Sequence, residues 1–395
     1  MTFSGKLKTL ALGVAVGVLG AASTAGAADI IKLGLSVPLS GSGAIWGKGS
    51  VFMCERAAKE VNEAGGVTVD GTAYTFQCIG YDNKYTAAEG TRVAQTLLNR
   101  EGVKFIGGSL GTAPAQALQS LTERQGVLMF TTAWGASIKG PKFPLTFTQM
   151  NTPFEILPLL IPYVKQAHPE AKTLVMLNPN DASGQDTEAV ANKVWKDTGI
   201  EILSSDFYER GTTEFQPIAA RILSLNPDIV DLGAMPPADA GAVFRELASL
   251  GWDGIKVVEV GTGVDGLKAT GGDAVEGVYM GAAVSFEGGE VSDHQHEVNE
   301  EARAAIGESL NTIQIGFYDA VYALKAAMEA AGSIEPREVA KALPDVTFRT
   351  FYGDEIGFYG MDNYGSRQQM KLPVIVTQVK DGKLVEAARV TPTGN

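Results

Sequence analysis

The stretch VKFIGGSLGTAPAQALQSLTERQGVLMFTTAWG, residues 103–135, carries the pattern that decides the fold. It reads as a short apolar strand over 103–106, a small-residue loop, a helix over 113–125 and a second apolar strand over 127–131. A helix between two consecutive apolar strands predicts that the strands are parallel and that the helix crosses over one face of their sheet. The loops that follow the two strands should therefore meet at the carboxyl edge of the sheet, where open α/β sheets bind ligands.

The same alternation extends in both directions along the chain and pauses only around residues 141–153. The remaining expected strands cover residues 31–37, 74–81, 173–177, 200–207, 229–233, 255–260 and 278–283, with a final hairpin of 374–379 and 384–387. The remaining expected helices cover residues 51–63, 87–99, 188–197, 215–225, 240–250 and 313–331. Short apolar strands that alternate with helices predict parallel sheets covered on both faces. The chain thus reads as two α/β units that follow one another without a flexible linker.

Length and charge narrow the class of protein. A single core rarely grows beyond about 250 to 300 residues, so 395 residues favour two domains. The 32 basic and 45 acidic side chains give a net charge of −13, which argues against a nucleic acid partner because phosphates require a basic surface.

The N-terminal residues 1–27 have the features of a secretory signal peptide. Lys6 and Lys8 precede an apolar run over 10–19, and Ala25-Gly26-Ala27 supplies the small residues of a cleavage site. The apolar run is too short for a permanent membrane anchor, and no later stretch is long and apolar enough to insert stably. We therefore expect a mature chain that begins near Ala28 and resides in the periplasm.

Two cysteines, Cys54 and Cys78, are the only ones in the chain. Cys54 lies on the apolar side of an expected helix, and Cys78 alternates with apolar residues on an expected strand. An exported protein can retain a disulfide, so a bond between helix and strand is one reading; two separate buried thiols are the other.

Motifs for catalysis or nucleotide binding are weak. His168 precedes a proline, and His294 and His296 lie in an acidic polar stretch, so solvated positions suit all three better than a metal site. The sequence has no Gly-x-Ser-x-Gly motif. Gly47-Lys48 resembles the end of a phosphate-binding loop, but Gly49 stands where the magnesium-binding hydroxyl is needed. We expect no enzyme activity and no cofactor or metal.

The loops at the predicted sheet edge suit a small ligand better. Ser109 and Thr112 offer hydroxyl groups, and Gly111 lets the backbone approach a ligand closely at the start of a helix, where free N–H groups attract anions. Capping of the helix is the alternative role for the two hydroxyls. Trp46 and Trp134 read as loop tryptophans that either anchor the core or form an aromatic wall for an apolar ligand.

Several fragments together resemble the periplasmic solute-binding proteins of branched-chain (hydrophobic) amino acid ABC importers. The fragments are Ile31-Lys32-Leu33-Gly34, Pro38-Leu39-Ser40-Gly41, Ala64-Gly65-Gly66-Val67, Tyr81-Asp82-Asn83, Phe105-Ile106-Gly107-Gly108 and Phe317-Tyr318-Asp319-Ala320. The resemblance implies a type I periplasmic binding fold, in which two Rossmann-like lobes joined by a three-segment hinge close on a ligand. The first lobe would contain residues 28–148 and 282–350, and the second lobe residues 149–281 and 351–395.

The resemblance also implies where the ligand binds. The ligand-binding residues expected from the loops and the resemblance are Trp46, Ser109, Gly111, Thr112, Ala133, Trp134, Gly135, Ser183, Met235 and Thr262. The family usually places tyrosines near Ser183 and Met235 and an acidic residue near Thr262 to hold the ligand ammonium. None of these residues is evident in this sequence, and Gly135 replaces an expected threonine. A compact hydrophobic or aromatic carboxylate is therefore a serious candidate for the ligand beside an amino acid.

The function that these expectations favour is a periplasmic binding subunit, acting as a monomer, that captures a small solute and delivers it to an inner-membrane ABC permease. A periplasmic ligand sensor with a separate receptor is the alternative, and an exported enzyme is a third possibility.

Overall fold

The computed structural model describes residues 1–2, 5, 28–259, 263–287 and 291–392. Most of the expected signal peptide, and Thr262 of the expected site, lie outside these residues. Within them, no helix combines the length and the apolar character needed to cross a bilayer.

The first sheet has the strand order β14-β15-β6-β5-β4-β1-β3-β2. Its strands are β1 (Asp29–Val37), β2 (Val67–Val69), β3 (Thr72–Asp82), β4 (Phe105–Ser109), β5 (Leu128–Thr131), β6 (Thr146–Thr148), β14 (Phe358–Tyr359) and β15 (Gln369–Met370). Pairing among β3, β1, β4, β5 and β6 is parallel, as the helices between these strands predict.

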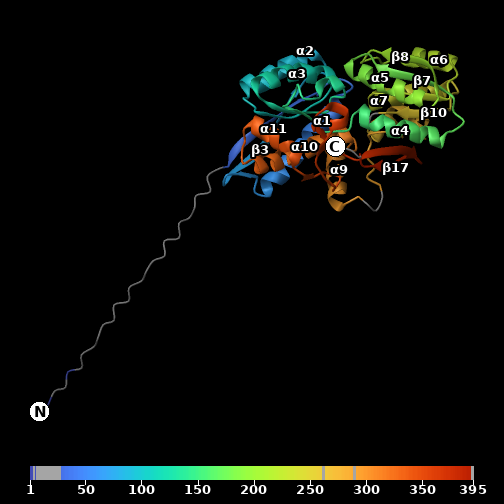
Figure 1. Cartoon of the computed structure of the whole chain (residues 1–395). Coiled ribbons are helices and arrows are strands. Elements are labelled where there is room, and N and C mark those ends of the chain that lie inside the picture. Colours follow the sequence, from blue (N-terminus) through green and yellow to red (C-terminus); the bar gives the residue numbers. More distant parts are fainter. Residues whose placement is uncertain (3–4, 6–27, 260–262, 288–290, 393–395) are drawn as a thin grey trace.

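Helices cover both faces of the first sheet. One face packs on α1 (Ala44–Glu63) and α10 (Thr312–Ala331), and the other on α2 (Ala87–Gln95) and α3 (Thr112–Gln125). Burial of apolar side chains on both faces explains why these strands read as continuous apolar runs. Two further helices of this lobe, α9 (Asp293–Ile306) and α11 (Pro336–Ala342), are labelled in Figure 1. A short helix, α12 (Met361–Tyr364), lies in the chain between β14 and β15.

The second sheet has the order β17-β16-β11-β10-β9-β7-β8. Its strands are β7 (Thr173–Pro179), β8 (Glu201–Tyr208), β9 (Ile229–Asp231), β10 (Ile255–Val258), β11 (Tyr279–Met280), β16 (Val374–Lys380) and β17 (Lys383–Val390). Helices α4 (Pro153–Ala167) and α5 (Ala182–Asp197) cover one face, and α6 (Gln216–Ser224), α7 (Pro237–Ser249) and α8 (Val264–Gly271) the other. Two lobes lie side by side in Figure 1, which confirms the predicted two-lobed α/β fold.

The chain crosses between the lobes after β6, after β11 and between β15 and β16. Hydrogen bonds tie these crossings together and to α10: Asn151 Nδ2 donates to the Pro373 carbonyl at 2.9 Å, and Thr312 Oγ1 donates to the Ala282 carbonyl at 2.6 Å. The first and third crossings are therefore bonded to each other, and the second crossing is bonded to α10.

The last crossing comes later than the predicted boundary at residue 350. The short strands β14 and β15 belong to the first sheet, and the chain enters the second sheet only at β16. Strands of two residues carry no alternating pattern, so the sequence gives little sign of their sheet.

Helix α1 begins seven residues before the predicted start at Val51. Two glycines in this added part of the helix allow close packing. A Cβ on Gly47 would lie 1.8 Å from the Pro38 carbonyl oxygen, and one on Gly49 would lie 2.2 Å from Gln314 Nε2. Trp46 is consequently in the first turn of a helix and not in a loop.

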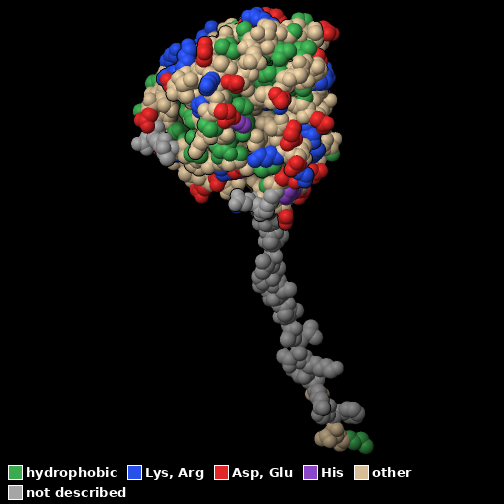
Figure 2. Space-filling view, turned by 90° about the vertical axis from the view of Figure 1, so that its right-hand side faces the viewer, with side chains coloured by type: hydrophobic (Ala, Val, Ile, Leu, Met, Phe, Trp, Pro, Cys, Tyr) green, Lys and Arg blue, Asp and Glu red, His purple; other side chains and the backbone are tan. Residues whose placement is uncertain are grey.

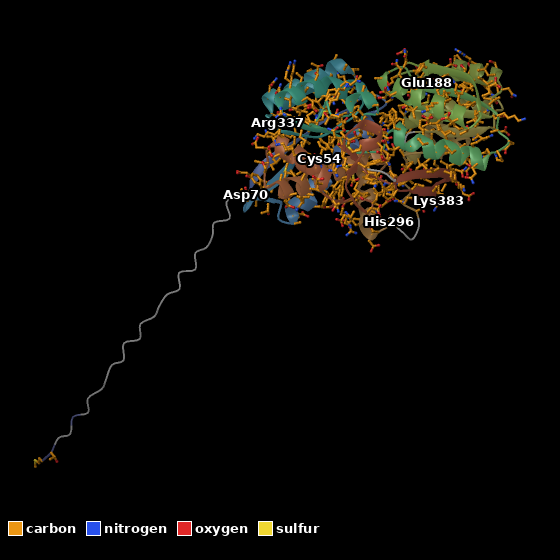
Figure 3. The ribbon with its side chains drawn as sticks, viewed as in Figure 1. Cys54, Asp70, Glu188, His296, Arg337 and Lys383 are labelled. Carbon is orange, nitrogen blue, oxygen red and sulfur yellow. A yellow bond between two sulfur atoms is a disulfide. The ribbon has the colours of Figure 1, made fainter. Side chains whose placement is uncertain are left out.

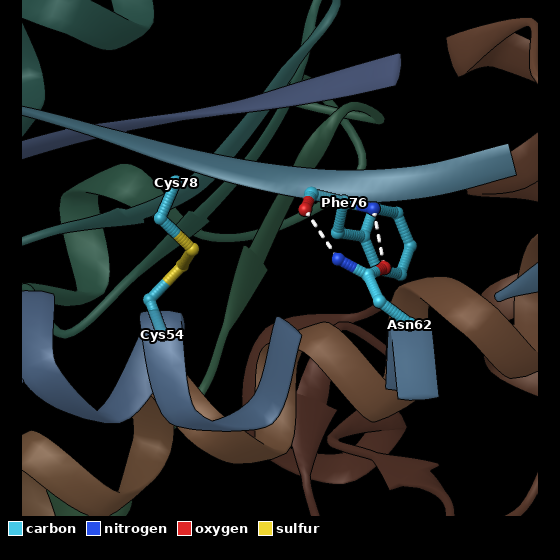
Figure 4. Close-up of a disulfide and its surroundings, with 4 residues drawn as sticks. All are labelled: Cys54, Asn62, Phe76 and Cys78. Carbon is cyan, nitrogen blue, oxygen red and sulfur yellow. Dashed lines mark hydrogen bonds between the residues drawn. A yellow bond between two sulfur atoms is a disulfide. The ribbon is translucent and has the colours of Figure 1, made fainter. Parts of the chain in front are cut away.

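Cys54 of α1 and Cys78 of β3 form a disulfide, with their Cα atoms 6.2 Å apart (Figure 4). Farther along the same helix, the Asn62 side chain makes two hydrogen bonds to the backbone of Phe76, 2.9 and 2.8 Å long. Together these contacts fix α1, and with it Trp46, against the sheet.

Candidate functional site

The loop between β4 and α3 supplies the first group of polar side chains. Ser109 ends β4 and Thr112 begins α3, and both are fully buried. Gly111, with φ at +93°, makes the turn between them that residues with a Cβ rarely adopt. The Ser109 hydroxyl has no hydrogen-bond partner among the described residues, although it is buried. A buried hydroxyl without a partner is costly, so this group is suited to a ligand.

The loop after β5 is bonded to the first loop, as the sheet topology predicts. Thr131 Oγ1 donates to the Ser109 carbonyl at 3.0 Å, and the Trp134 N–H donates to Thr112 Oγ1 at 3.3 Å. Ala133 and Trp134 are 1% and 4% exposed, respectively. The two loops thus form one continuous buried surface at the edge of the first sheet.

Trp46 lies close to a residue that the sequence analysis did not single out. Its ring centroid is 6.3 Å from that of Tyr85, in the loop between β3 and α2. The Trp46 indole N–H is buried and finds no acceptor among the described residues. The indole therefore offers a second buried donor, in addition to an apolar ring.

The second lobe reaches this surface through the first turn of α5. The Thr112 N–H donates to Ser183 Oγ at 3.2 Å, the two hydroxyl oxygens are also 3.2 Å apart, and Ser183 Oγ lies 3.3 Å from the Tyr85 hydroxyl. Ser183 lies inside α5, which starts at Ala182, six residues before the expected helix start at residue 188. The structure is therefore closed at this point.

Two further residues of the expected site, Met235 and Gly135, make other contacts than the residues described so far. Met235 is fully buried and packs in the apolar core of the second lobe. A Cβ on Gly135 would lie only 2.6 Å from Asp186 Oδ2 of α5, so the small residue makes room for a carboxyl group of the second lobe. Burial is the larger cause that raises the pKa of Asp186, and the negative charge of the nearby Asp181 raises it further.

Tyr85 and Arg210 are the functional candidates that sequence reasoning missed. The Arg210 guanidinium carbon lies 4.3 Å from the centroid of the Tyr85 ring, a cation–π contact between the lobes. Tyr85 has φ at +60°, which is unusual for a residue with a Cβ, and its N–H donates to the Asn83 side chain at 2.9 Å. The Asn83 amide in turn donates to the Leu110 carbonyl at 2.9 Å, so the strained loop is held against the Ser109 loop.

We call the set of Trp46, Tyr85, Thr112, Trp134, Ser183 and Arg210 the interlobe cluster. It combines aromatic rings, hydroxyl groups and a guanidinium. No group of side chains with the composition of a metal site occurs among the described residues. This chemistry suits reversible binding of a small polar molecule with an apolar body.

The histidines lie away from the interlobe cluster. His168 Nε2 is 3.1 Å from the Tyr279 hydroxyl, and His294 Nε2 is 3.4 Å from the Tyr318 hydroxyl. His296 is on the same helix as His294, at the lower rim of the first lobe in Figure 3, whereas Glu188 marks the second lobe. Acidic and basic side chains are interspersed on the face shown in Figure 2.

A fold of two α/β lobes joined by three crossings, with a polar cluster closed between them, defines the class of hinged binding proteins. A family model described as "Periplasmic binding protein" matches residues 30–383, and the chain belongs to this family. The relatives found are named as binding proteins and not as enzymes, in agreement with the expectation from the sequence.

Two curated relatives illustrate the sequence similarity. The leucine-, isoleucine-, valine-, threonine- and alanine-binding protein of Pseudomonas aeruginosa is 26% identical over 346 residues, which cover 87% of this chain and 90% of the relative. A Leu/Ile/Val-binding protein homologue of Brucella abortus is 27% identical over 353 residues, which cover 88% and 91%.

Solved structures share the fold. A leucine-binding protein of Thermotoga maritima superposes with a TM-score of 0.74 at 18% identity, covering 92% of this chain and 99% of that one. A solute-binding protein of R. palustris in complex with benzoate gives a TM-score of 0.75 at 19% identity, covering 93% and 98%.

Proposed function

We propose that this chain is the periplasmic substrate-binding subunit of an ABC importer, which captures a small carboxylate-bearing solute between its lobes and delivers it unchanged to an inner-membrane permease. The chain would be exported by the signal peptide at residues 1–27 and act as a monomer. The solute would have a hydrophobic or aromatic body, because Trp46 and Trp134 both flank the proposed site.

The observation that carries this proposal is the buried Ser109 hydroxyl without a partner among the described residues, at the end of β4 and just before α3. The N-terminus of a helix favours a negative charge, and the Trp46 indole N–H adds another unused donor. A carboxylate near Ser109 would accept from these donors and compete with Ser183 for the Thr112 N–H. Capture by both lobes would shift the population toward the closed form.

The test begins with the wild-type protein purified without denaturation. Mass spectrometry of small molecules that remain bound identifies candidates, and calorimetric titration with branched-chain amino acids, aromatic acids and aliphatic acids measures affinity. We expect at least one carboxylate to bind. A folded protein that retains nothing and binds no member of the panel would contradict the proposal.

Ser109→Ala tests the site itself. Loss of a hydrogen bond to a charged group should weaken binding by about 10- to 100-fold. Ser120→Ala is the matched control, because Ser120 is an exposed serine of α3 whose hydroxyl donates only to a carbonyl of its own helix. Equal affinities of the two variants would place the carboxylate elsewhere.

A further inference from the structure

Arg210 is the one basic side chain of the interlobe cluster, and it comes from the second lobe. It follows β8, and its side chain is only 17% exposed. One face of the guanidinium lies on the Tyr85 ring of the first lobe. Its Nε donates to Asp181 Oδ2, and Asp181 Oδ1 accepts from the Gly184 N–H at 3.0 Å as the cap of α5. The guanidinium is therefore held in place from both lobes.

Most of the hydrogen-bonding capacity of Arg210 is unused. Both Nη1 and Nη2 are buried, and neither has an acceptor among the described residues. A guanidinium carries five N–H donors, and Asp181 accepts only the one on Nε. A buried charged group with unpaired donors is costly, which points to an acceptor that the polypeptide does not supply.

The other acidic side chains of this region do not supply the missing acceptor among the described residues. Asp239 accepts a 2.9 Å hydrogen bond from the Tyr208 hydroxyl. Asp186 lies beside Gly135 with its Oδ2 buried and without a hydrogen-bond partner among the described residues. Stacking on Tyr85 occupies a face of the guanidinium, whereas its edge, where the N–H groups point, is the part that binds a carboxylate in a planar two-bond arrangement.

We propose that Arg210 binds a second carboxylate of the captured solute, so that the ligand is a small dicarboxylate with one acidic group on the Ser109–Thr112 loop and the other on Arg210. This inference rests on the proposed function and narrows its ligand class. Such a molecule would bridge the two lobes, because Ser109 belongs to the first and Arg210 to the second. An amino acid with an apolar side chain would leave Nη1 and Nη2 unpaired.

Matched ligand pairs test the inference in the wild-type protein without any substitution. Calorimetric titration would compare glutarate with butyrate and phthalate with benzoate, and would include leucine. We expect the diacid of at least one pair to bind about 100-fold more tightly than its monoacid, the gain given by a charge-assisted two-bond contact. Tighter binding of leucine or of both monoacids would overturn the dicarboxylate assignment and leave the proposed function standing. Failure of every ligand would count against both.

Arg210→Met keeps much of the packing on Tyr85 and removes the donors. It should reduce diacid affinity about 100-fold and monoacid affinity less than about threefold. Arg221→Met is the matched control: Arg221 of α6 is 66% exposed and pairs with Asp206, so its loss should leave both affinities unchanged. An equal loss for diacid and monoacid in the Arg210 variant would mean that Arg210 only stabilises closure, and would overturn the inference.

Discussion

The hydroxyl oxygens of Thr112 and Ser183 lie 3.2 Å apart, although 71 residues separate them and each belongs to a different lobe. Thr112 begins α3 in the first lobe and Ser183 lies in the first turn of α5 in the second. The N-terminal ends of two helices thus meet through side-chain hydroxyls. Neutral contacts of this kind are worth about 1 kcal/mol each, so this contact would be a small obstacle to the proposed opening of the lobes.

Ser183→Ala should shift the ligand-free protein toward the open form. The substitution removes the hydrogen bonds of Ser183 to Thr112 and Tyr85, so the ratio of closed to open molecules should fall about fivefold for each 1 kcal/mol lost. Fluorescence energy transfer between one label on each lobe measures this ratio. Ser120→Ala should leave the ratio unchanged, and the same closed fraction in both variants would contradict the expectation.

Reduction of the disulfide should destabilise the first lobe. Cys54 and Cys78 are 24 residues apart, and a loop of this length predicts a loss of roughly 3 kcal/mol in the chain-entropy model. Urea denaturation with and without a reductant measures the change. The chain contains no other cysteine, so a Cys54→Ala/Cys78→Ala double variant should be insensitive to the reductant. Coincident curves for reduced and oxidised wild type would disprove a stabilising role.

Gly108→Ala should destabilise the protein because α10 packs too closely for a methyl group. A Cβ on Gly108 would lie 2.1 Å from Cε1 of Phe317, a fully buried residue of α10. Overpacking of a core typically costs about 1 to 3 kcal/mol, which urea denaturation can resolve. Adding Phe317→Leu should recover part of this loss. A double variant with the sum of both single losses would rule out the proposed clash.

The buried carboxyl group of Asp319 should make the free energy of unfolding fall as the pH rises. Burial raises its pKa to about 8, and its Oδ1 accepts a 2.7 Å hydrogen bond from the Phe351 N–H. The folded chain keeps this proton up to about pH 8, whereas the unfolded chain releases it near pH 4. The contribution of this proton to the free energy of unfolding is therefore complete below about pH 4. It declines between about pH 4 and pH 8 and is lost above about pH 8.

Asp319→Asn is neutral at every pH and keeps the oxygen that accepts from Phe351. Relative to the wild type, the free energy of unfolding of this variant should therefore rise by on the order of 3 to 4 kcal/mol between pH 5 and pH 8. Urea denaturation across this range gives both curves. The slopes of the two curves against pH are compared, because replacing the carboxyl group by an amide also changes the free energy of unfolding by an amount that does not depend on pH. Parallel curves would show that Asp319 does not titrate in this window.

Part of the candidate site was predictable from local sequence. Ser109, Thr112 and Trp134 follow consecutive strands of a parallel sheet, and this topology alone brings their loops to one edge. Tyr85 and Arg210 carry no such signal. Their contact spans 125 residues and exists only where the lobes close, so neither position looks functional in its own segment.

The sequence by itself determined the alternation of strands and helices, the two-lobed architecture and the family. The reason is that the spacing of apolar residues and the residues that favour turns act between near neighbours in the chain. The tertiary structure alone decided that Gly47 and Gly49 lie within a helix, that β14 and β15 join the first sheet, and that Arg210 reaches Tyr85 from the opposite lobe. Those outcomes depend on close approach between segments distant in the chain, where packing and the burial of charge, and not local preference, set the free energy.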